Sequence, residues 1–561
     1  MDRLRRYVPI TSWLPSYQRS WLSRDVVAGV TVWGLLIPEM IAYASLAGLP
    51  PQAGLYTLLA SLGIYAIFGT SRQLVVAGTS ASAILVYSTV TDLAPKSEAS
   101  YMTLAAGMIV LTGILFVVSG LLRLGFITSF LSRPVMDGFV FGLAIFVTVS
   151  QLPKLFGLTK GSGDTIRQFA HLVAHLGDAS WTTFAVGAIS LVLLFSLERF
   201  APRLPGGLVV LVLGIALSAG LGLAGHGVAT VGQIPTGLPS PAWPHLKASD
   251  TWLLLSGAAG MMLVIFSEAL GAGQTFADKH GYRLESSQEM IALGLANLGS
   301  GILGGLAGGG SLSQTAVNDG AGAQTEISPV VAFVLSLITI VALTPLFKDL
   351  PEAVLAALII SAVSHLMRVG QMREFYRLAP REFWLGVLTL GGVIVLDVLP
   401  GLVIGVVSSL ILLVYRASRP PVSLLGEDPG TPGSFVDVKR QPDAVLPFGI
   451  SIVRPDAPLF YANAQGVRDA VESIVASAST TINAVALDID ANDELDITTT
   501  EELVKLVKHL QSIGVTFGLV HVHGPALQMA ERSGLLHLVG RDHVFPDIRA
   551  AVAWGRDTSR S

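Results

Sequence analysis

Gly310-Ser311-Leu312-Ser313-Gln314 opens a short apolar segment at residues 312–323, and Gly78-Thr79-Ser80-Ala81-Ser82 opens another at residues 79–93. Both begin with glycine and hydroxyl residues, and both fall short of the roughly 20 apolar residues that span a bilayer. Short, glycine-interrupted apolar segments in corresponding positions of two halves point to a transporter's binding site. The two segments therefore suggest a membrane fold built from two related halves.

The composition supports a membrane protein. Charged residues make up 13% of the 561 residues, whereas a soluble domain usually carries about 25%. Residues 1–420 hold 24 basic and 21 acidic residues, and residues 421–561 hold 11 and 18, a net charge of −7. We therefore expect a membrane part followed by a soluble domain. The absence of cysteine excludes disulfides and thiolate metal sites, and without a basic run no nucleic-acid partner is expected.

Apolar windows predict fourteen membrane-spanning segments, seven in each half of the membrane part. The first seven are 26–46, 52–68, 79–93, 101–122, 130–150, 179–198 and 206–224. The second seven are 252–270, 288–305, 312–323, 327–345, 352–367, 382–398 and 400–416. An odd number per half gives the halves opposite orientations, and the two short segments are each third in their half. The sequence therefore predicts 7+7 inverted repeats.

The distribution of basic residues supports this topology. With the N-terminus in the cytoplasm, 18 of the 24 Lys and Arg residues of residues 1–420 lie on the inner side, as the positive-inside rule requires. The remaining six are Lys96, Lys154, Lys160, Arg167, Lys247 and Lys348. We expect a multi-pass protein of the inner (plasma) membrane with both termini in the cytoplasm. Its parts are a segment 1–25, a transmembrane domain 26–418, and a linker with a soluble domain at 419–561.

The two short segments suggest an anion site. A half-helix that starts near the midplane of the membrane points its free N–H groups and positive dipole end at the cavity. Two such ends bind an anion without lysine or arginine. Hydroxyl donors are available at both ends, from Thr79, Ser80, Ser82, Ser311 and Ser313. The alternative is that these residues serve only as helix caps and small packing residues.

Glu39 and Glu268 are the chief acidic residues inside predicted spans, where ionisable groups are costly and therefore candidates for function. Glu39 and Glu268 lie in the first spans of their halves, 39 residues before Gly78 and 42 residues before Gly310. An ionised carboxylate beside a bound anion is destabilised, because it loses its hydrating water and is repelled by the negative charge of the anion. We hypothesise that one of them, Glu39 by preference, binds a proton together with the anion. The alternative is a neutral or backbone-bonded group at a helix break, which Pro38 would provide.

Other patterns point away from an enzyme. Gly299-Ser300-Gly301-Ile302-Leu303-Gly304 matches the dinucleotide fingerprint but lies in an apolar helix without a preceding strand, so it predicts close helix packing. No Walker A sequence and no nucleophile–base arrangement occurs. His521 and His523 alternate on a predicted strand without a third ligand, so no metal site is expected.

Several motifs in order resemble the SulP anion transporters, solute carrier family 26. They are Ile37-Pro38-Glu39-Met40-Ile41-Ala42-Tyr43-Ala44, Phe68-Gly69-Thr70-Ser71-Arg72-Gln73-Leu74, Ala292-Leu293-Gly294-Leu295-Ala296-Asn297, and Gly310-Ser311-Leu312-Ser313 with Thr315-Ala316-Val317-Asn318. The resemblance implies a core and gate architecture shared with uracil-type transporters, a cytoplasmic STAS domain and a homodimer in the lipid membrane. It also implies an anion between the ends of the third and tenth helices. The implied site residues are Glu39, Tyr43, Thr79, Ser80, Glu268, Ser311, Ser313 and Gln314.

Two departures from the family pattern bear on the substrate. Many sulfate-type members carry Gln at the position of Glu39 and Arg at the position of Gln314. This chain therefore has an added carboxylate and lacks a cation, so a divalent anion loses its charge partner. Proton cotransport through Glu39 would offset that loss. The Gly-Pro that often opens the third helix is Gly78-Thr79 here.

The tail reads as a small α/β domain, consistent with STAS. Residues 426–433 are a loop by composition. In bacterial STAS regulators a phosphorylated hydroxyl follows an Asp at a strand–helix junction, and Thr498 occupies that place. The better-supported interpretation makes Thr498 a helix N-cap with Glu501 as its capping-box partner.

The sequence thus predicts a secondary transporter of a small anion, with sulfate-type anions favoured, proton coupling through Glu39, and elevator-like alternating access. The alternatives are sodium-coupled bicarbonate or dicarboxylate uptake, an anion channel or voltage-responsive anion-binding protein, and nucleobase transport on the same fold. No cofactor beyond a coupling H⁺ or Na⁺ is expected.

Overall fold

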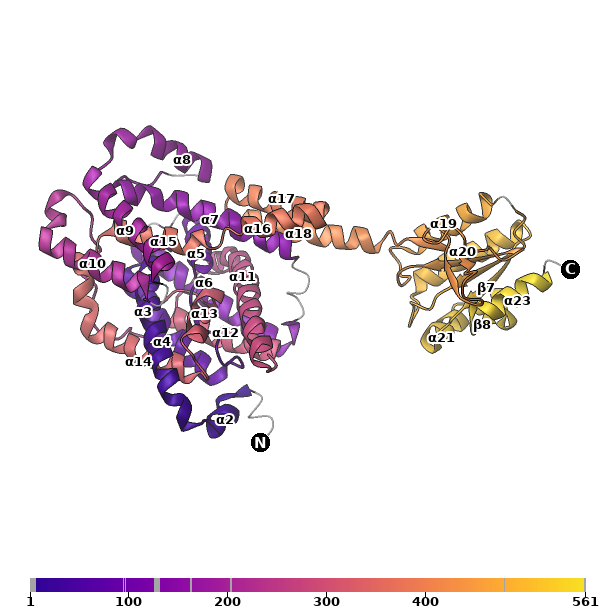
Figure 1. The fold of residues 1–561 in the computed structure, drawn as a ribbon, viewed down its shortest axis with the longest axis horizontal. Helices are drawn as coiled ribbons and strands as arrows, with labels where there is room; N and C mark the ends of the chain where they lie inside the picture. Colours follow the sequence, from indigo (N-terminus) through magenta and orange to yellow (C-terminus); the bar gives the residue numbers. More distant parts are fainter. Residues whose placement is uncertain are drawn as a thin grey trace. The chain divides into compact units, whose positions relative to one another are not determined.

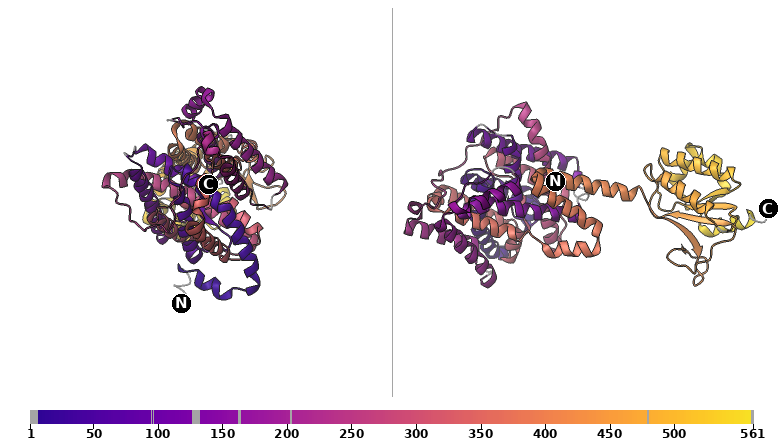
Figure 2. Two further views of the ribbon diagram at one scale, coloured as in Figure 1. Left: turned by 90° about the vertical axis from the view of Figure 1, so that its left-hand side faces the viewer. Right: turned by 90° about the horizontal axis from the view of Figure 1, so that it is seen from above.

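The computed structural model describes residues 7–93, 95, 97–125, 132–161, 164–201, 204–478 and 480–558. Lys96, the first six residues of the predicted N-terminal segment and the start of the predicted span 130–150 lie outside the described residues. The chain divides into two compact units, Met1–Ser409 and Leu410–Ser561. The first is helical and the second contains a mixed sheet, as Figure 1 and Figure 2 show.

Each predicted span corresponds to a helix. The first seven are α3 (Leu22–Leu46), α4 (Pro51–Phe68), α5 (Ser80–Asp92), α6 (Glu98–Leu121), α7 (Arg133–Phe156), α9 (Trp181–Phe200) and α10 (Gly206–Leu221). The second seven are α11 (Ala248–His280), α12 (Ser286–Ile302), α13 (Leu312–Gly320), α14 (Ile327–Ile338), α15 (Glu352–Ser364), α17 (Pro380–Leu396) and α18 (Val398–Ala417). Nine stretches of the described chain are long and apolar enough to cross a membrane. Short helices α2 (Ile10–Trp13), α8 (Thr165–Ala174) and α16 (Val369–Leu378) were not predicted.

Helix packing repeats in matched pairs that relate the two halves. Helix α6 packs on α12 as α14 packs on α4, and α11 packs on α6 as α3 packs on α14. In the same way α17 packs on α7 as α9 packs on α15. Each contact maps onto its counterpart when every helix is replaced by the helix of the same rank in the other half, for example α3 by α11 and α4 by α12. The structure is therefore an inverted repeat.

The same packing separates a core from a gate. Helices α3–α6 and α11–α14 pack mainly on one another, and so do α7, α9, α10, α15 and α17. The two groups meet chiefly where α3 contacts α10 and α15. The site residues predicted from the sequence all lie in the core group.

Glycines bring α6 and α12 into backbone contact. A Cβ atom on Gly294 would lie 2.8 Å from the Val117 nitrogen, and one on Gly301 would lie 3.0 Å from the Ala106 carbonyl oxygen. Gly301 belongs to the dinucleotide-like motif, which is therefore a packing surface. Small residues are how helices in membranes approach closely.

The second unit is a six-stranded sheet in the order β4-β3-β5-β6-β7-β8. The strands are β3 (Val422–Glu427), β4 (Phe435–Asp437), β5 (Ile450–Pro455), β6 (Ala484–Asp488), β7 (Thr516–Val520) and β8 (Val544–Phe545). Strand β3 is antiparallel to β4 and β5, and β5 to β8 are parallel. The helices are α19 (Ala464–Ala476), α20 (Ile497–Ser512), α21 (Gly524–Arg532), α22 (Leu535–Val539) and α23 (Ile548–Thr558).

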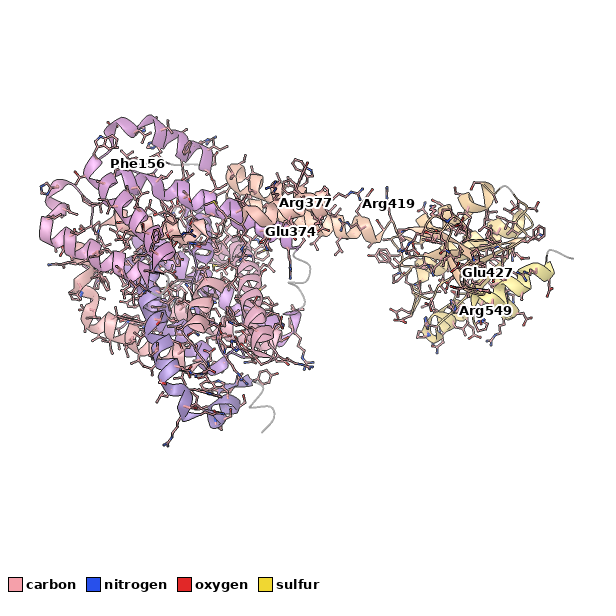
Figure 3. All side chains as sticks on the ribbon, viewed as in Figure 1. Phe156, Glu374, Arg377, Arg419, Glu427 and Arg549 are labelled. Atoms are coloured by element: carbon pink, nitrogen blue, oxygen red, sulfur yellow. The ribbon has the colours of Figure 1, made fainter. Side chains whose placement is uncertain are left out.

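Two sequence predictions in this unit were wrong. Gly426 and Glu427 belong to β3 rather than to a loop, and Gly433 N donates to Glu427 Oε1 at 2.9 Å. Arg549 Nε donates to the Gly433 carbonyl at 3.2 Å, so the segment is fixed between the two labelled side chains of Figure 3. Strand β3 extends to Glu427 because Gly426 and Glu427 pair with Val436 and Phe435 of β4, a pairing that local composition does not reveal, whereas residues 428–433 do form a loop.

The N-cap of α20 is Asp496, not Thr498. Asp496 Oδ1 accepts from Thr499 N at 2.8 Å, and its Oδ2 accepts from Thr499 Oγ1 at 2.9 Å and from Tyr461 N at 2.8 Å. A carboxylate that can bind three donors caps better than a hydroxyl group. Thr498 lies in the first turn of α20 with an exposed side chain.

Candidate functional site

The two half-helices begin at a two-stranded ribbon. Strand β1 (Val76–Gly78) leads into α5 and pairs antiparallel with β2 (Gly308–Gly310), which leads into α13. Val76 is opposite Gly310 and Gly78 is opposite Gly308, so the ribbon is about 7 Å long between its end Cα atoms. The N-termini of α5 and α13 therefore lie near each other and the helices leave the ribbon in opposite directions.

The first half-helix has a closed cap. Thr79 is the N-cap of α5, its Oγ1 accepts from Ser82 N at 3.2 Å, and Thr79 N donates to Ser82 Oγ at 3.2 Å. Ser82 Oγ also donates to the Ala307 carbonyl at 2.9 Å. The Ser82 hydroxyl is thus committed to structure, which corrects its interpretation as a donor to an anion. Ser80 is the first residue of α5 and is buried.

The second half-helix has an open end. Ser311 is the N-cap of α13, and its side chain makes no capping hydrogen bond. Instead Ser311 Oγ and Ser313 Oγ bond to each other at 2.9 Å, and Ser313 is exposed. The free N–H groups and the hydroxyl pair are therefore available to a ligand.

Glu39 and Gln314 meet across the core. Gln314 Nε2 donates to Glu39 Oε2 at 2.8 Å and to the Gly78 carbonyl at 3.3 Å, so one amide connects α3, α13 and the end of β1. Gln314 Oε1 is buried and has no hydrogen-bond partner among the described residues. The pair brings together two residues that are 275 positions apart in the sequence.

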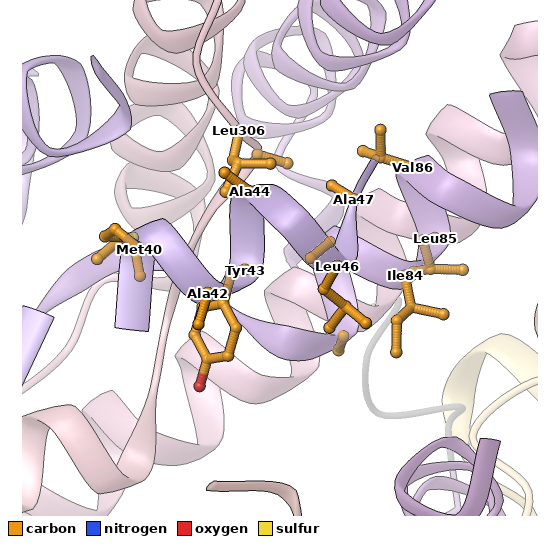
Figure 4. Packing of buried hydrophobic residues seen from close by; sticks show 14 of the residues in the cluster. Met40, Ala42, Tyr43, Ala44, Leu46, Ala47, Ile84, Leu85, Val86 and Leu306 are labelled. Atoms are coloured by element: carbon orange, nitrogen blue, oxygen red, sulfur yellow. The ribbon is translucent and has the colours of Figure 1, made fainter. Parts of the chain in front are cut away.

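Glu268 occupies the corresponding place at the first half-helix. Its carboxyl group lies against the Thr79 side chain, so each half-helix has a carboxyl group from the first helix of the opposite half beside its N-terminus. Tyr43 stands on α3 within electrostatic reach of both carboxyl groups. Figure 4 shows Tyr43 among the apolar side chains that pack around α3. The structure thus brings the predicted site residues together at the two helix ends.

The two carboxyl groups are partly accessible to solvent. Glu39 and Glu268 are half-buried, whereas Gln314 is 1% exposed. In the part of the chain that the structure describes, hydrogen-bond donors but no cation accompany them. The space between the helix ends therefore offers N–H and O–H donors to an anion, with carboxyl groups that can carry a proton.

Helix α3 continues through Pro38, so the helix break considered for Glu39 does not occur. The proline removes one backbone donor but does not end the helix, because tertiary packing on both sides holds it.

Sequence reasoning missed the residue that holds β2. Asn297 Oδ1 accepts from Gly308 N at 3.0 Å, and Asn297 Nδ2 donates to the Gly308 carbonyl at 2.8 Å. Asn297 is fully buried on α12. A buried Asn in an apolar helix next to a glycine-rich segment was the only available signal, because its partner is backbone and carries no side-chain pattern.

Inverted halves and two half-helices that begin at a short ribbon define a membrane transporter of the core and gate type. The sulfate permease family model matches residues 22–389, and a STAS domain model matches residues 440–551. This chain belongs to the sulfate permease family, a family of transporters rather than enzymes, and carries a C-terminal STAS domain.

Relatives with known names cover nearly the whole chain. It is 33% identical to a probable sulfate transporter of Mycobacterium tuberculosis over 96% of both chains. It is 30% identical to the chloroplastic sulfate transporter 4.1 of Arabidopsis thaliana, over 98% of this chain and 83% of that one. The fold matches murine Slc26a9, described as an anion transporter in the inward-facing state, with a TM-score of 0.91 and 26% identity over 98% of this chain and 94% of that one.

Proposed function

We propose that this chain is a secondary active transporter that moves a small anion, with a sulfate-type inorganic anion favoured, together with a proton bound at Glu39. The hydrogen bond between Glu39 and Gln314 at the N-terminus of α13 carries the proposal. Sulfate is favoured because the relative from Mycobacterium tuberculosis is named a probable sulfate transporter and the relative from Arabidopsis thaliana a sulfate transporter. Anion binding at the open end of α13 follows from its free N–H groups and the Ser311–Ser313 hydroxyl pair.

The Gln314 amide links the proton to the anion. With Glu39 ionised, Gln314 Nε2 is used as its donor and Oε1 has no partner. A protonated Glu39 carries no negative charge and its O–H can itself donate a hydrogen bond, so it no longer repels an anion at the α13 end. Protonation thus removes a negative charge and supplies a donor in one step. The remaining substrate contacts assigned here are Tyr43, Thr79 and Ser80, and Glu268 is the second proton-binding candidate.

The architecture supports an elevator-like movement, in which the core carries the site past the gate. All candidate residues belong to the core, and the core meets the gate mainly along one helix, α3. We further propose a homodimer in the plasma membrane with both termini in the cytoplasm. The proposed division is a segment 1–25, a transmembrane domain 26–418 and a linker with the STAS domain at 419–561.

Uptake into proteoliposomes tests the coupling. A pH difference of one unit is worth about 1.4 kcal/mol per proton, so cotransport of one proton with each sulfate predicts about tenfold accumulation of labelled sulfate when the membrane potential is held at zero. The Glu39→Gln variant is expected to lose this accumulation while still exchanging labelled for unlabelled anion. Glu374→Gln, an exposed position on α16 labelled in Figure 3, is the matched control.

The outcomes separate the alternatives. Full proton-driven uptake by Glu39→Gln contradicts the coupling role of Glu39. If accumulation requires sodium and is greater for bicarbonate or a dicarboxylate than for sulfate, the protein is a sodium-coupled transporter of that anion. Saturable current without accumulation indicates a channel.

A further inference from the structure

A second cavity of about 730 Å³ lies in the first unit, away from the half-helix ends. The N-terminal segment forms one wall, and the chain after α4, after α6 and between α11 and α12 forms the others. Pockets that bind small organic molecules are about 300–1,000 Å³. The cavity therefore accommodates a ligand much larger than a sulfate ion.

Three arginines, one from each of these connections, line the cavity: Arg72, Arg123 and Arg283. Their side chains are exposed, and none forms an ion pair within the described residues. Two carboxyl groups also belong to the lining residues, Glu285 and Glu326. Even with both carboxyl groups ionised, the three guanidinium groups outnumber them. The accessible surface of the cavity is net positive.

One arginine is positioned before any ligand arrives. The Arg72 guanidinium lies 5.3 Å from the centre of the Tyr282 ring. The Tyr282 hydroxyl accepts from Arg72 N at 3.1 Å, contacts Ser71 Oγ at 2.9 Å and donates to Gln73 Oε1 at 2.8 Å. The ring is therefore a fixed platform that limits the conformations of Arg72.

Arg123 stands at a backbone position that favours glycine. Its φ is +59°, in the left-handed region, directly after the C-cap of α6 at Leu122. Glycine is the usual residue at such a helix end because a side chain strains it. An arginine therefore lies at the cavity in a backbone conformation that is strained for any residue with a side chain.

The N-terminal wall is aromatic and firmly attached. Trp13 and Trp21 line the cavity, Gln288 Nε2 donates to the Tyr7 carbonyl at 3.1 Å, and the Tyr17 hydroxyl donates to Asp25 Oδ2 at 3.2 Å. Burial and the adjacent Asp25 carboxylate raise the pKa of Tyr17 to about 12, so the phenol remains a donor at neutral pH.

Two polar atoms of residues that line the cavity lack partners, one in the N-terminal wall and one on α12. Trp13 Nε1 and Gln288 Oε1 are buried and make no hydrogen bond among the described residues, and the Gln288 side chain is 5% exposed. Both atoms are sealed from solvent, so the groups that face the open space of the cavity and can reach a ligand are the three arginines.

We propose that this cavity binds a phosphate-bearing ligand, foremost the headgroup of an anionic phospholipid, through Arg72, Arg123 and Arg283. Planar guanidinium groups match phosphate oxygens in pairs, and tryptophan is enriched at the boundary between membrane and water. Leu121 at the end of α6 also lines the cavity and is 59% exposed, which gives an acyl chain an apolar path away from the headgroup. A soluble phosphate ester shares the headgroup chemistry and is the other source.

Binding of a short-chain fluorescent phosphatidylglycerol to the purified full chain in detergent tests the proposal, with phosphatidylcholine, whose headgroup phosphate is neutralised by its own choline, as the comparison without net charge. The triple variant Arg72→Gln, Arg123→Gln, Arg283→Gln is expected to bind phosphatidylglycerol at least about tenfold more weakly, since each charge-assisted bond contributes more than 1 kcal/mol. The matched control replaces three exposed arginines at α16, Arg368, Arg373 and Arg377, by Gln and is expected to bind as the unaltered chain does.

A competition experiment with a soluble phosphate ester and a second variant complete the test. Displacement of the lipid by glycerol 3-phosphate supports the headgroup chemistry, and tighter binding of that ester than of the lipid makes the soluble ester the source. The single variant Arg123→Gly suits the left-handed backbone, so a severalfold loss of lipid affinity without a fall in melting temperature supports a binding role. Unchanged affinity in the triple variant, or an equal loss in the α16 control, overturns the proposal.

Discussion

At the scale of single residues, Glu39 and Gln314 act as one unit, because the only side-chain donor bonded to Glu39 in the described structure is the Gln314 amide. Exchanging both residues, Glu39→Gln with Gln314→Arg, replaces a titratable carboxyl group with a fixed cation. We expect sulfate uptake by this double variant to become independent of the pH gradient. Labelled sulfate uptake with and without an inward proton gradient measures the effect.

The single variants provide the controls for this exchange. Gln314→Arg alone pairs the new guanidinium group with Glu39, so uptake is expected to fall below that of both the double variant and the unaltered chain. A double variant that remains dependent on the gradient would falsify the role of Glu39 in coupling.

A second residue-scale prediction concerns two buried carboxyl groups near the start of α3 and α14. Asp25 Oδ1 accepts from Gln324 N at 2.6 Å and Thr325 N at 3.2 Å, and its Oδ2 accepts from Thr325 Oγ1 at 2.8 Å. Glu326 is buried without a hydrogen-bond partner among the described residues. Asp25→Asn is expected to destabilise the protein by about 1–3 kcal/mol, because its amide turns a donor toward other donors.

Glu326→Gln is the isosteric comparison and is expected to leave stability unchanged or raise it, since it removes a buried carboxyl group that faces Asp25 and Glu289. Thermal unfolding of the detergent-solubilised chain measures both variants. An equal loss of stability in the two variants would show that Glu326 has an essential partner.

At the scale of elements, the contact between α6 and α12 depends on the absence of side chains. A Cβ on Gly294 would lie 2.8 Å from Val117 N and 2.9 Å from the Gly113 carbonyl oxygen, both of them backbone atoms that cannot turn aside. Gly294→Ala is therefore expected to cost about 1–3 kcal/mol of stability, as overpacking does. A lower melting temperature of the purified chain is the readout.

Gly391→Ala in α17 is the control, because no atom lies within 4 Å of the added Cβ. Alanine favours a helix over glycine by up to about 1 kcal/mol, so this variant is expected to be neutral or stabilised. If both glycines tolerate alanine equally, the close contact of α6 and α12 does not determine stability.

The elements show which features a sequence carries by itself. Hydropathy predicted the positions of the spanning helices because length and apolar character are local properties. It missed α8 and α16, whose polar faces interrupt the apolar signal, and it assigned the cap of α20 to Thr498 when Asp496 satisfies more donors. The two half-helix ends were predictable from glycine and hydroxyl residues, but the contact of Asn297 with β2 was not, because Asn297 bonds only to backbone.

At the scale of the whole molecule, the inverted repeat explains why the predicted site consists of matched parts. Each half contributes one half-helix and one carboxyl group, and the carboxyl group of one half lies at the half-helix of the other: Glu39 at α13 and Glu268 at α5. The asymmetry lies in the caps, since α5 has a closed capping box and α13 an open end. Substrate and proton selectivity are therefore expected to depend more on the α13 end.

The elevator-like movement proposed above makes a prediction that can be tested cleanly, because the sequence contains no cysteine. Gly34 lies on α3 of the core, and Pro205 directly precedes α10 of the gate. A Cβ on Gly34 would be 3.8 Å from the Pro205 Cβ, within the range that a disulfide spans. Oxidation of Gly34→Cys with Pro205→Cys is expected to abolish sulfate uptake by holding the core against the gate, and a reductant is expected to restore it.

A disulfide within one group provides the control. A Cβ on Gly187 in α9 would lie 3.6 Å from the Cβ of Ala353 in α15, and both helices belong to the gate. Oxidising Gly187→Cys with Ala353→Cys leaves the gate free to move as a body, so uptake is expected to continue. Because the two disulfides have similar geometry and differ in whether they join the moving parts, transport that survives both would mean that α3 and α10 keep their contact throughout the cycle. The core would then have to open the site by local motion of α5 and α13.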